Sequence, residues 1–311
     1  MADIGGTHSR LARWSEQTGL ESPLRVRNDG YRGPLELLEE WFRDSGDGPR
    51  RIVLALAMPV GSDARQLTNR AWRFEPRELI DALRLDSLVI VNDFAAAAAG
   101  VAALGPEHGL ALNPDGMAIP GTRLVLGPGT GLGTAAIVAD EPPRIVASEA
   151  GHITFGSAAD IADQLIRQGR ARWGRVSWER VLSGEGITWL HEVVSGFALR
   201  PEEVADAATR GDAQALRTVA TFSRLLGEFA GDVCLAFQAL EGVYLCGGVL
   251  RGLLPSFDTR AFLAAFADKG RFSELLRRVP IYFVAGHELG LKGAAQLVAG
   301  RCRMPLKEWN A

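Results

Sequence analysis

The chain has 311 residues, a formal net charge of −3 and a pI of about 6.0. This charge balance provides no basic surface for nucleic acid or for an anionic membrane. No apolar run reaches the roughly 20 residues of a membrane span, and we identify no secretion signal at the N-terminus. Three widely spaced cysteines, Cys234, Cys246 and Cys302, favour reduced, buried thiols in a cytoplasmic protein over a disulfide framework or a zinc site.

The first third of the chain alternates between helix and strand patterns. Leucine and isoleucine at helical spacing predict helices over 34–45 and 75–85, each with a proline in its first turn. Apolar, β-branched runs predict buried strands over 51–57 and 87–93, and an alanine-rich helix is expected at 94–104. This order is typical of an α/β protein.

The remainder of the chain is richer in helix. Glycine and proline gather at 104–122, where we place a domain boundary. Beyond the glycine-rich segment described next, the pattern predicts two helical regions, two strands and a closing helix, at 157–174, 218–240, 242–248, 279–286 and 290–302.

Glycine occupies every second position of 127–133, in the segment LVLGPGTGLGTAAIV. A dinucleotide-binding fold needs a helix after such a turn, but Pro142 and Pro143 prevent a long helix and 144–148 continues as a strand pattern. We therefore expect a β-hairpin whose backbone N–H groups cradle the phosphates of a nucleotide, with an ordinary glycine-rich hairpin as the alternative. The candidate phosphate-binding residues are Gly129, Thr130 and Gly131.

A similar glycine turn, DIGGT, lies at the start of the chain. Gly5 and Gly6 let the backbone approach a phosphate, and Thr7 can donate its hydroxyl. Asp3 is placed to hold Mg²⁺ through water. A duplicated fold with a phosphate turn in each half would explain both turns, although so short a match also arises by chance; the matching segments are 2–14 and 126–140.

Asn92 and Asp93 end the strand predicted over 87–93. Ligands of α/β sheets bind at the carboxyl ends of strands, so we expect both side chains to face a cleft. Asp93 can accept the proton of an attacking hydroxyl during phosphoryl transfer. The alternative role of Asp93 is to cap the alanine-rich helix, and the two roles are compatible.

The segment SEAGHITF places Glu149 and His152 three residues apart. A carboxylate and an imidazole together can bind several hydroxyl groups of a sugar. A metal site is the alternative, and it needs further ligands; the nearest other histidines are His108 and His191.

The segment SWERVLSGEGI, at 177–187, is predicted to begin with a capped helix. Ser177 is the expected cap, and Glu179 is a carboxylate in the first turn. By itself this pattern indicates no more than a helix start.

Together these segments resemble the bacterial ATP-dependent glucokinase family, within the actin-like sugar kinase and Hsp70 superfamily. They follow the family's order and cover nearly the whole chain: DIGGTHSRLA, LTNRAWRF (67–74), VNDFAAAA, GPGTGLGTA, SEAGHITF, ERVLSGEGI, YLCGGVL and FADKGRF (266–272). The resemblance implies a two-lobed actin-like ATPase (ribonuclease H-like) α/β fold with a cleft between a small and a large domain. We expect the small domain to comprise 1–103 and 294–311, and the large domain 104–293.

The resemblance also implies an activity and the roles of single residues. The implied reaction transfers the γ-phosphoryl group of ATP, with Mg²⁺, to the 6-hydroxyl of D-glucose, the first step of glycolysis, in a cytoplasmic homodimer. Asp93 matches the catalytic base. The implied glucose ligands are Asn92, Asp93, Glu149, His152 and Glu179, and the implied ATP contacts are Asp3, Gly5, Gly6, Thr7, Gly129, Thr130 and Gly131, with Gly247 and Gly248 beside the adenosine.

Two features depart from the family pattern. Only Met1 and Ala2 precede Asp3, where the family has several apolar residues. If the protein itself lacks those residues, we expect the first strand to be frayed. No cysteine follows His152 in HITFGSAADIAD, so the chain resembles the zinc-free group of these kinases.

Three other functions stay open at the level of sequence. A hexokinase of broader or different sugar specificity would share the same motifs. A non-catalytic sugar-sensing regulator is disfavoured by Asp93 and by the lack of a basic helix-turn-helix extension. A nucleotide-dependent dehydrogenase is disfavoured by Pro142 and Pro143, which follow the glycine turn.

Overall fold

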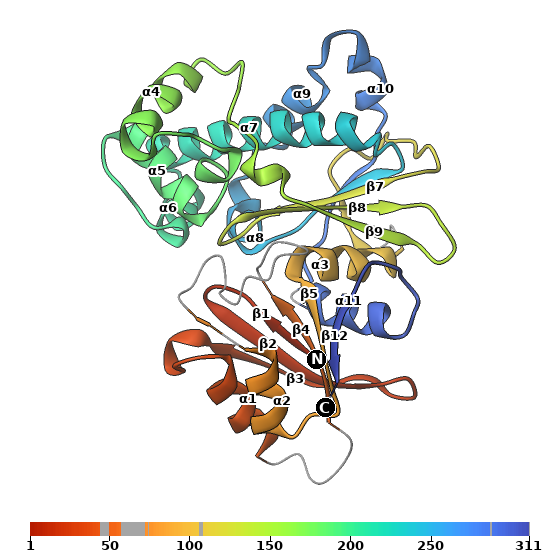
Figure 1. The fold of residues 1–311 in the computed structure, drawn as a ribbon. Helices are drawn as coiled ribbons and strands as arrows, with labels where there is room; N and C mark the ends of the chain where they lie inside the picture. Colours follow the sequence, from red (N-terminus) through yellow and green to blue (C-terminus); the bar gives the residue numbers. More distant parts are fainter. Residues whose placement is uncertain (44–49, 57–71, 74, 106–107, 287, 311) are drawn as a thin grey trace. The chain divides into compact units, whose positions relative to one another are not determined.

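The computed structural model describes residues 1–43, 50–56, 72–73, 75–105, 108–286 and 288–310, so of the segment 67–74 only Trp72 and Arg73 are described. The chain forms two compact units (Figure 1). The first comprises Met1–Leu104, Asp140–Ala147 and Gly286–Ala311, and the second comprises Gly105–Ala139 and Ser148–Ala285. Both contain strands and helices, which confirms the predicted α/β class.

A six-stranded sheet is the centre of the first unit. Across the sheet the strands are β12 (Lys307–Asn310), β5 (Ser87–Asn92), β4 (Arg51–Leu56), β1 (Ala2–Ile4), β2 (His8–Ser15) and β3 (Gly19–Arg27). β1, β4 and β5 are parallel, whereas β2, β3 and β12 are antiparallel to their neighbours. All three residues of β1 are buried and pair with both β2 and β4, so this strand is not frayed with only Met1 and Ala2 before Asp3.

The helices of the first unit pack on this sheet and on one another. α1 contacts α2, and α3 packs along α11. A Cβ atom on Gly293 of α11 would overlap the carbonyl oxygen of Ala96 in α3, so these helices meet backbone to backbone. The alanine-rich sequence permits this close packing. The helices are α1 (Pro34–Phe42), α2 (Pro76–Leu83), α3 (Asp93–Ala102) and α11 (Leu289–Val298), with a 3₁₀ turn η1 (Asn28–Gly30).

A second six-stranded sheet lies mostly in the second unit. Its strands, in order across the sheet, are β6 (Leu110–Ala111), β11 (Ile281–Phe283), β10 (Gly242–Leu245), β7 (Arg123–Pro128), β8 (Leu132–Val138) and β9 (Arg144–Ser148), and β9 belongs to the first unit up to Ala147. β7, β10 and β11 are parallel, β8 pairs antiparallel with β7, and β6 is an antiparallel edge strand beside β11. From β11 to β8 this topology matches that of β5 to β2 in the first sheet, which supports the predicted duplication. The antiparallel edge strands differ, because β6 precedes the other strands of its sheet in the chain and β12 follows those of the first.

The predicted hairpin is confirmed. β7 and β8 are antiparallel, with Pro128 opposite Leu132 across the turn, and β9 follows as a strand. A strand–turn–helix dinucleotide site is therefore excluded at this turn.

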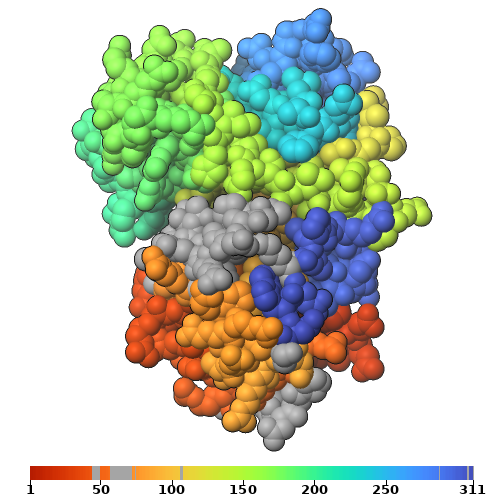
Figure 2. All heavy atoms as spheres, in the orientation of Figure 1, coloured from red at the N-terminus to blue at the C-terminus, as the bar shows by residue number. Residues whose placement is uncertain are grey.

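Helices make up most of the second unit outside its sheet. The long helix α7 buries Phe222 and Phe229 and packs against α9, which lies beside it in Figures 1 and 2. The α-helices are α4 (Ala162–Trp173), α5 (Gly184–Ser195), α6 (Pro201–Thr209), α7 (Ala213–Phe237), α8 (Gly248–Leu253), α9 (Thr259–Ala267) and α10 (Ser273–Arg277). The 3₁₀ turns are η3 (Ala150–His152), η4 (Trp178–Arg180), η5 (Leu254–Ser256) and η6 (Gly270–Phe272).

All three cysteines are buried, as predicted, and the structure joins none of them in a disulfide. Among the helices that the structure describes, none is both long and apolar enough to cross a membrane.

Candidate active site

The first glycine turn connects β1 to β2. The Gly5 N–H donates a hydrogen bond to the His8 carbonyl oxygen at 3.1 Å, which closes the turn. Gly5 and Gly6 are half-buried, whereas Thr7 is exposed at the tip. The turn therefore presents a threonine hydroxyl on a backbone without bulky side chains, which suits a phosphate group.

Asp3 lies in β1, two residues before this turn. Its side chain is 13% exposed, and Oδ2 accepts a hydrogen bond from Arg10 Nη1 at 3.1 Å. Burial raises the pKa of the Asp3 carboxyl, and the charge and hydrogen bond of Arg10 oppose this shift. Asp3 offers one carboxylate, which already pairs with Arg10. Such a group suits Mg²⁺ that is held through water and by nucleotide phosphates, and it does not suit a site built from several protein ligands.

Asn28, which no motif indicated, braces the first turn. Its fully buried amide donates to the Gly5 carbonyl oxygen at 2.7 Å and accepts from the Ser9 hydroxyl at 2.7 Å. The Asn28 N–H also donates to the Thr7 carbonyl oxygen at 3.0 Å. Because this residue is 23 positions from Gly5, sequence pattern alone gave no signal for the contact.

Asn92 and Asp93 join β5 to α3. Asn92 Oδ1 accepts from the Ala95 N–H at 2.9 Å, so Asn92 is the N-cap of α3. Asp93 Oδ1 accepts from the adjacent Phe94 N–H at 2.8 Å. The alternative role considered for Asp93, capping the alanine-rich helix, therefore belongs to Asn92.

The strand register places these two residues on the same edge of the sheet as the first turn. Ile4 in β1 lies opposite Leu56 in β4, and Leu56 lies opposite Asn92 in β5. Two strand spacings separate β1 from β5, roughly 10 Å. The first unit thus brings its predicted phosphate turn and its predicted base to one carboxyl edge.

The second glycine turn, Gly129 to Gly131, connects β7 to β8. The Gly129 N–H donates to the Gly131 carbonyl oxygen at 2.7 Å, and Thr130 is exposed at the tip. The arrangement is that of the first turn, with half-buried glycines beside an exposed threonine. Both turns therefore present the same chemistry to a ligand.

Glu149, His152 and Glu179 form one cluster in the second unit. His152 Nε2 lies 3.9 Å from Glu149 Oε2 and 3.8 Å from Glu179 Oε1. The side chains of Glu149 and His152 are half-exposed, and that of Glu179 is 24% exposed. Burial raises the pKa of the Glu149 carboxyl. His152 lowers this pKa, and the charge of Glu179 raises it.

This cluster offers several hydrogen-bond acceptors and an imidazole to a polyhydroxylated ligand. Among the residues that the structure describes, no three His, Cys, Asp or Glu side chains are arranged so that they could hold a metal ion. His191, one of the two other histidines considered, is fully buried and bonded through Nδ1 to the Thr218 hydroxyl at 2.9 Å.

The helix start predicted at Ser177 was misplaced. Residues 178–180 form only the 3₁₀ turn η4, and the Ser177 side chain makes no capping bond there. Ser183 caps the true helix α5, since its hydroxyl accepts from the Gly186 N–H at 3.1 Å. Glu179 therefore lies on a short 3₁₀ turn and not within a longer helix.

Gly247 and Gly248 follow β10 and lead into α8. Gly247 has a φ of 103°, which favours glycine, and a Cβ atom there would overlap the carbonyl oxygen of Pro128. The turn that carries the predicted adenosine contacts therefore packs directly on a strand of the phosphate hairpin. Each unit thus gathers its own predicted site residues.

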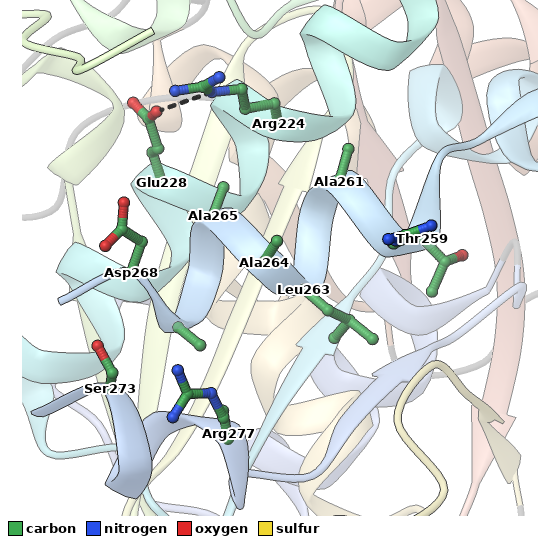
Figure 3. A pocket seen from close by; sticks show the side chains of 12 residues that line it. Arg224, Glu228, Thr259, Ala261, Leu263, Ala264, Ala265, Asp268, Ser273 and Arg277 are labelled. Atoms are coloured by element: carbon green, nitrogen blue, oxygen red, sulfur yellow. Dashed lines mark hydrogen bonds and ion pairs between the residues drawn. The ribbon is translucent and has the colours of Figure 1, made fainter.

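A pocket of about 1030 Å³ lies elsewhere in the second unit, along α7, α9 and α10 (Figure 3). None of the predicted site residues lines it. Two of its arginines already have carboxylate partners: Arg224 lies 3.4 Å from Glu228, and Arg277 lies 3.3 Å from Glu274.

Comparisons with known proteins agree with this geometry. A family model described as Glucokinase matches residues 1–301. The chain is 35% identical over 306 residues to a glucokinase of Chromohalobacter salexigens, covering 95% of this chain and 96% of that protein. The crystal structure of a glucokinase from an Antarctic psychrotroph matches with a TM-score of 0.74 and 28% identity, covering 94% and 96% of the two chains.

A third likeness concerns the fold alone. A ROK-family glucokinase from Streptomyces griseus, solved with glucose and AMPPNP, matches with a TM-score of 0.64 and 20% identity, covering 95% and 97% of the two chains. These neighbours confirm the expected two-lobed, actin-like sugar kinase fold.

Proposed function

The chain belongs to the glucokinase family and has the activity of an ATP-dependent glucose kinase; we propose here which of its residues carry out that activity. The observation that carries the proposal is the cluster of Glu149, His152 and Glu179, with carboxylate and imidazole groups within 4 Å of one another. Such a cluster suits the hydroxyl groups of a hexose, since each carboxylate oxygen accepts a hydrogen bond.

We assign sugar binding to this cluster together with Asn92 and Asp93. The carboxylates accept hydrogen bonds from sugar hydroxyls, and the imidazole of His152 offers ring nitrogens that can donate or accept. A site that holds several hydroxyls through buried or half-buried acceptors rejects analogues that lack one of them. Selectivity for glucose would then follow from the same side chains that bind it.

Asp93 is the proposed general base. In the reaction the oxygen of the sugar's 6-hydroxyl forms a bond to the γ-phosphorus, the bond from that phosphorus to the β,γ-bridging oxygen breaks, and the hydroxyl proton passes to the Asp93 carboxylate. The products are glucose 6-phosphate and ADP. Phosphoryl transfer depends mostly on positioning, so a carboxylate suffices as the base when it takes the proton late.

The two glycine turns are the proposed phosphate-binding segments. Gly5, Gly6 and Thr7 contribute the first, and residues 129–131 the second. Asp3 would contact the magnesium of the MgATP substrate through water, as its single available carboxylate suggests. Gly247 and Gly248 would contact the adenosine.

A coupled assay of ADP release over a panel of hexoses tests the activity, and Asp93→Asn tests the base. We expect glucose to be the fastest substrate of the panel. Asp93→Asn should lose turnover by at least roughly 100-fold, within the usual contribution of a general base, while still binding glucose in calorimetry. Turnover of the variant near that of the parent would reject Asp93 as the base.

We propose further that the protein is a cytoplasmic homodimer. Three buried cysteines that the structure joins in no disulfide support the compartment. Exposed apolar side chains of Leu110, Met117 and Ile119 offer surface for a second copy. Light scattering after size exclusion should give twice the chain mass of 33.4 kDa, and a mass equal to that of one chain would reject the dimer.

A further inference from the structure

The two carboxylate oxygens of Glu179 have different neighbours. Oε1 faces His152 Nε2 at 3.8 Å, on the side of the proposed sugar cluster. Oε2 accepts a hydrogen bond from the Leu132 N–H at 2.8 Å. Leu132 is the first residue of β8, directly after the glycine turn, and is 4% exposed. One side chain therefore contacts both the sugar cluster and the phosphate hairpin.

Other contacts join the same two parts of the second unit. The Gly184 N–H, at the start of α5, donates to the Gly129 carbonyl oxygen at 2.8 Å. Gly151, between Glu149 and His152, packs so closely on the hairpin that a Cβ atom there would overlap the Leu132 carbonyl oxygen. Both segments that carry the sugar cluster thus contact the backbone of the hairpin. Of the three contacts described here, the one made by Glu179 involves a side chain, and the other two are between backbone atoms.

We propose that Glu179 is a positioning residue for the nucleotide as well as a sugar ligand: its Oε2–Leu132 hydrogen bond holds the phosphate hairpin in the conformation that binds phosphate. The inference rests on the proposed function of the hairpin and of the cluster.

The Leu132 N–H belongs to a buried residue. Without an acceptor, this group would lose its hydrogen bond in a site from which the surrounding chain excludes most water, and the hairpin would rearrange to reach water or another acceptor. Hydrogen bonds to a charged group are among the stronger ones in proteins. The rearrangement should weaken nucleotide binding roughly tenfold, the change that a loss of about 1.4 kcal/mol produces.

Substitutions at Glu179 can separate its two contacts. In Glu179→Gln the amide oxygen can still accept from Leu132, because an N–H donor selects that atom, while the amide nitrogen then faces His152. In Glu179→Asp the charge remains, but the side chain is one methylene too short to make the same bond. Glu179→Ala removes both contacts, and His152→Ala leaves the Leu132 bond in place as the matched control.

Calorimetric titration with ADP and Mg²⁺, in the absence of sugar, is the test. We expect Glu179→Ala and Glu179→Asp to bind ADP roughly tenfold more weakly than the parent, and Glu179→Gln and His152→Ala to stay within about twofold. Glucose affinity, measured separately, should fall in Glu179→Ala and His152→Ala. If Glu179→Ala does not fold, as judged by circular dichroism, Glu179→Asp reports on the same bond.

Parental ADP affinity in Glu179→Ala or Glu179→Asp would overturn the proposal. So would a tenfold loss in His152→Ala, because the effect would then be general damage to the cluster, or in Glu179→Gln, which retains the acceptor. Unchanged glucose affinity in Glu179→Ala and His152→Ala would instead reject the proposed sugar site, whatever the ADP titrations show.

Discussion

Gly186 lies at the start of α5, where the helix passes close to the segment that carries Glu179. A Cβ atom on Gly186 would be 2.5 Å from the carbonyl carbon of Val181 and 2.6 Å from its oxygen. Ordinary van der Waals contact begins near 3.4 Å, so in Gly186→Ala the backbones of α5 and Val181 must separate by about 0.9 Å. Both are buried backbone segments, and no change of rotamer relieves the overlap.

We expect Gly186→Ala to lower the free energy of unfolding by about 1–3 kcal/mol, the usual cost of an overpacked interior. The displacement would also strain the Ser183 cap, whose hydroxyl bonds to the Gly186 N–H, and the bond from Gly184 to Gly129 in the hairpin. Chemical denaturation followed by circular dichroism measures the loss in free energy of unfolding. The KM values for ATP and glucose measure the strain on the Ser183 cap and on the bond from Gly184 to Gly129.

Gly184→Ala is the matched control. It lies in the first turn of the same helix, but its Cβ atom would meet the nearest atom, the Gly129 carbonyl oxygen, at 3.5 Å. This variant should be neutral or more stable than the parent by up to about 1 kcal/mol, since alanine favours helix over glycine. Equal stability of the two variants would refute the packing argument.

Three further predictions concern other parts of the chain. Asn28→Ala should destabilise the protein by about 1–3 kcal/mol in urea denaturation, because the Gly5 carbonyl oxygen and the Ser9 hydroxyl lose a buried partner; a loss below about 0.5 kcal/mol would contradict this. Burial lowers the pKa of His191, with Asp212 opposing, so the unfolded chain takes up a proton that the folded chain does not. Stability should therefore decline as the pH falls below about 6.5, by up to about 1.4 kcal/mol per pH unit, and His191→Leu should show a shallower decline than the parent; identical pH slopes would exclude this role. Asp258→Ala should cost about 1 kcal/mol in thermal or urea unfolding, since Asp258 caps α9 through the Ala261 N–H at 2.9 Å, and an unchanged midpoint would count against the cap.

Local chemistry made much of the fold predictable. Pro142 and Pro143 forbade a helix after the glycine turn, and the structure has a hairpin there. Pro34 and Pro76 each stand at the first position of a helix, as expected. Such features depend on the residue itself and its near neighbours, so they can be read without knowledge of the fold.

Contacts between distant segments were not predictable. The Glu179–Leu132 bond spans 47 positions, and its existence depends on how η4 packs on the hairpin. The hydrogen bonds of Asn28 with Gly5 and Ser9 also join segments that are distant in the sequence. Helix caps proved difficult for a different reason: Asn92 and Asp93 are both good capping residues, and only the exact backbone angles decide which of them begins α3. The roles assigned to individual site residues remain predictions.

The three buried thiols provide built-in reporters of how the protein comes apart. Cys302 belongs to the first unit, whereas Cys234 and Cys246 belong to the second, and burial raises the pKa of Cys234 to about 12. An alkylating reagent that requires a thiolate can reach these sulfurs only when the surrounding segment opens. Peptide-resolved labelling rates would therefore measure the opening of each half of the duplicated architecture separately, without any engineered probe.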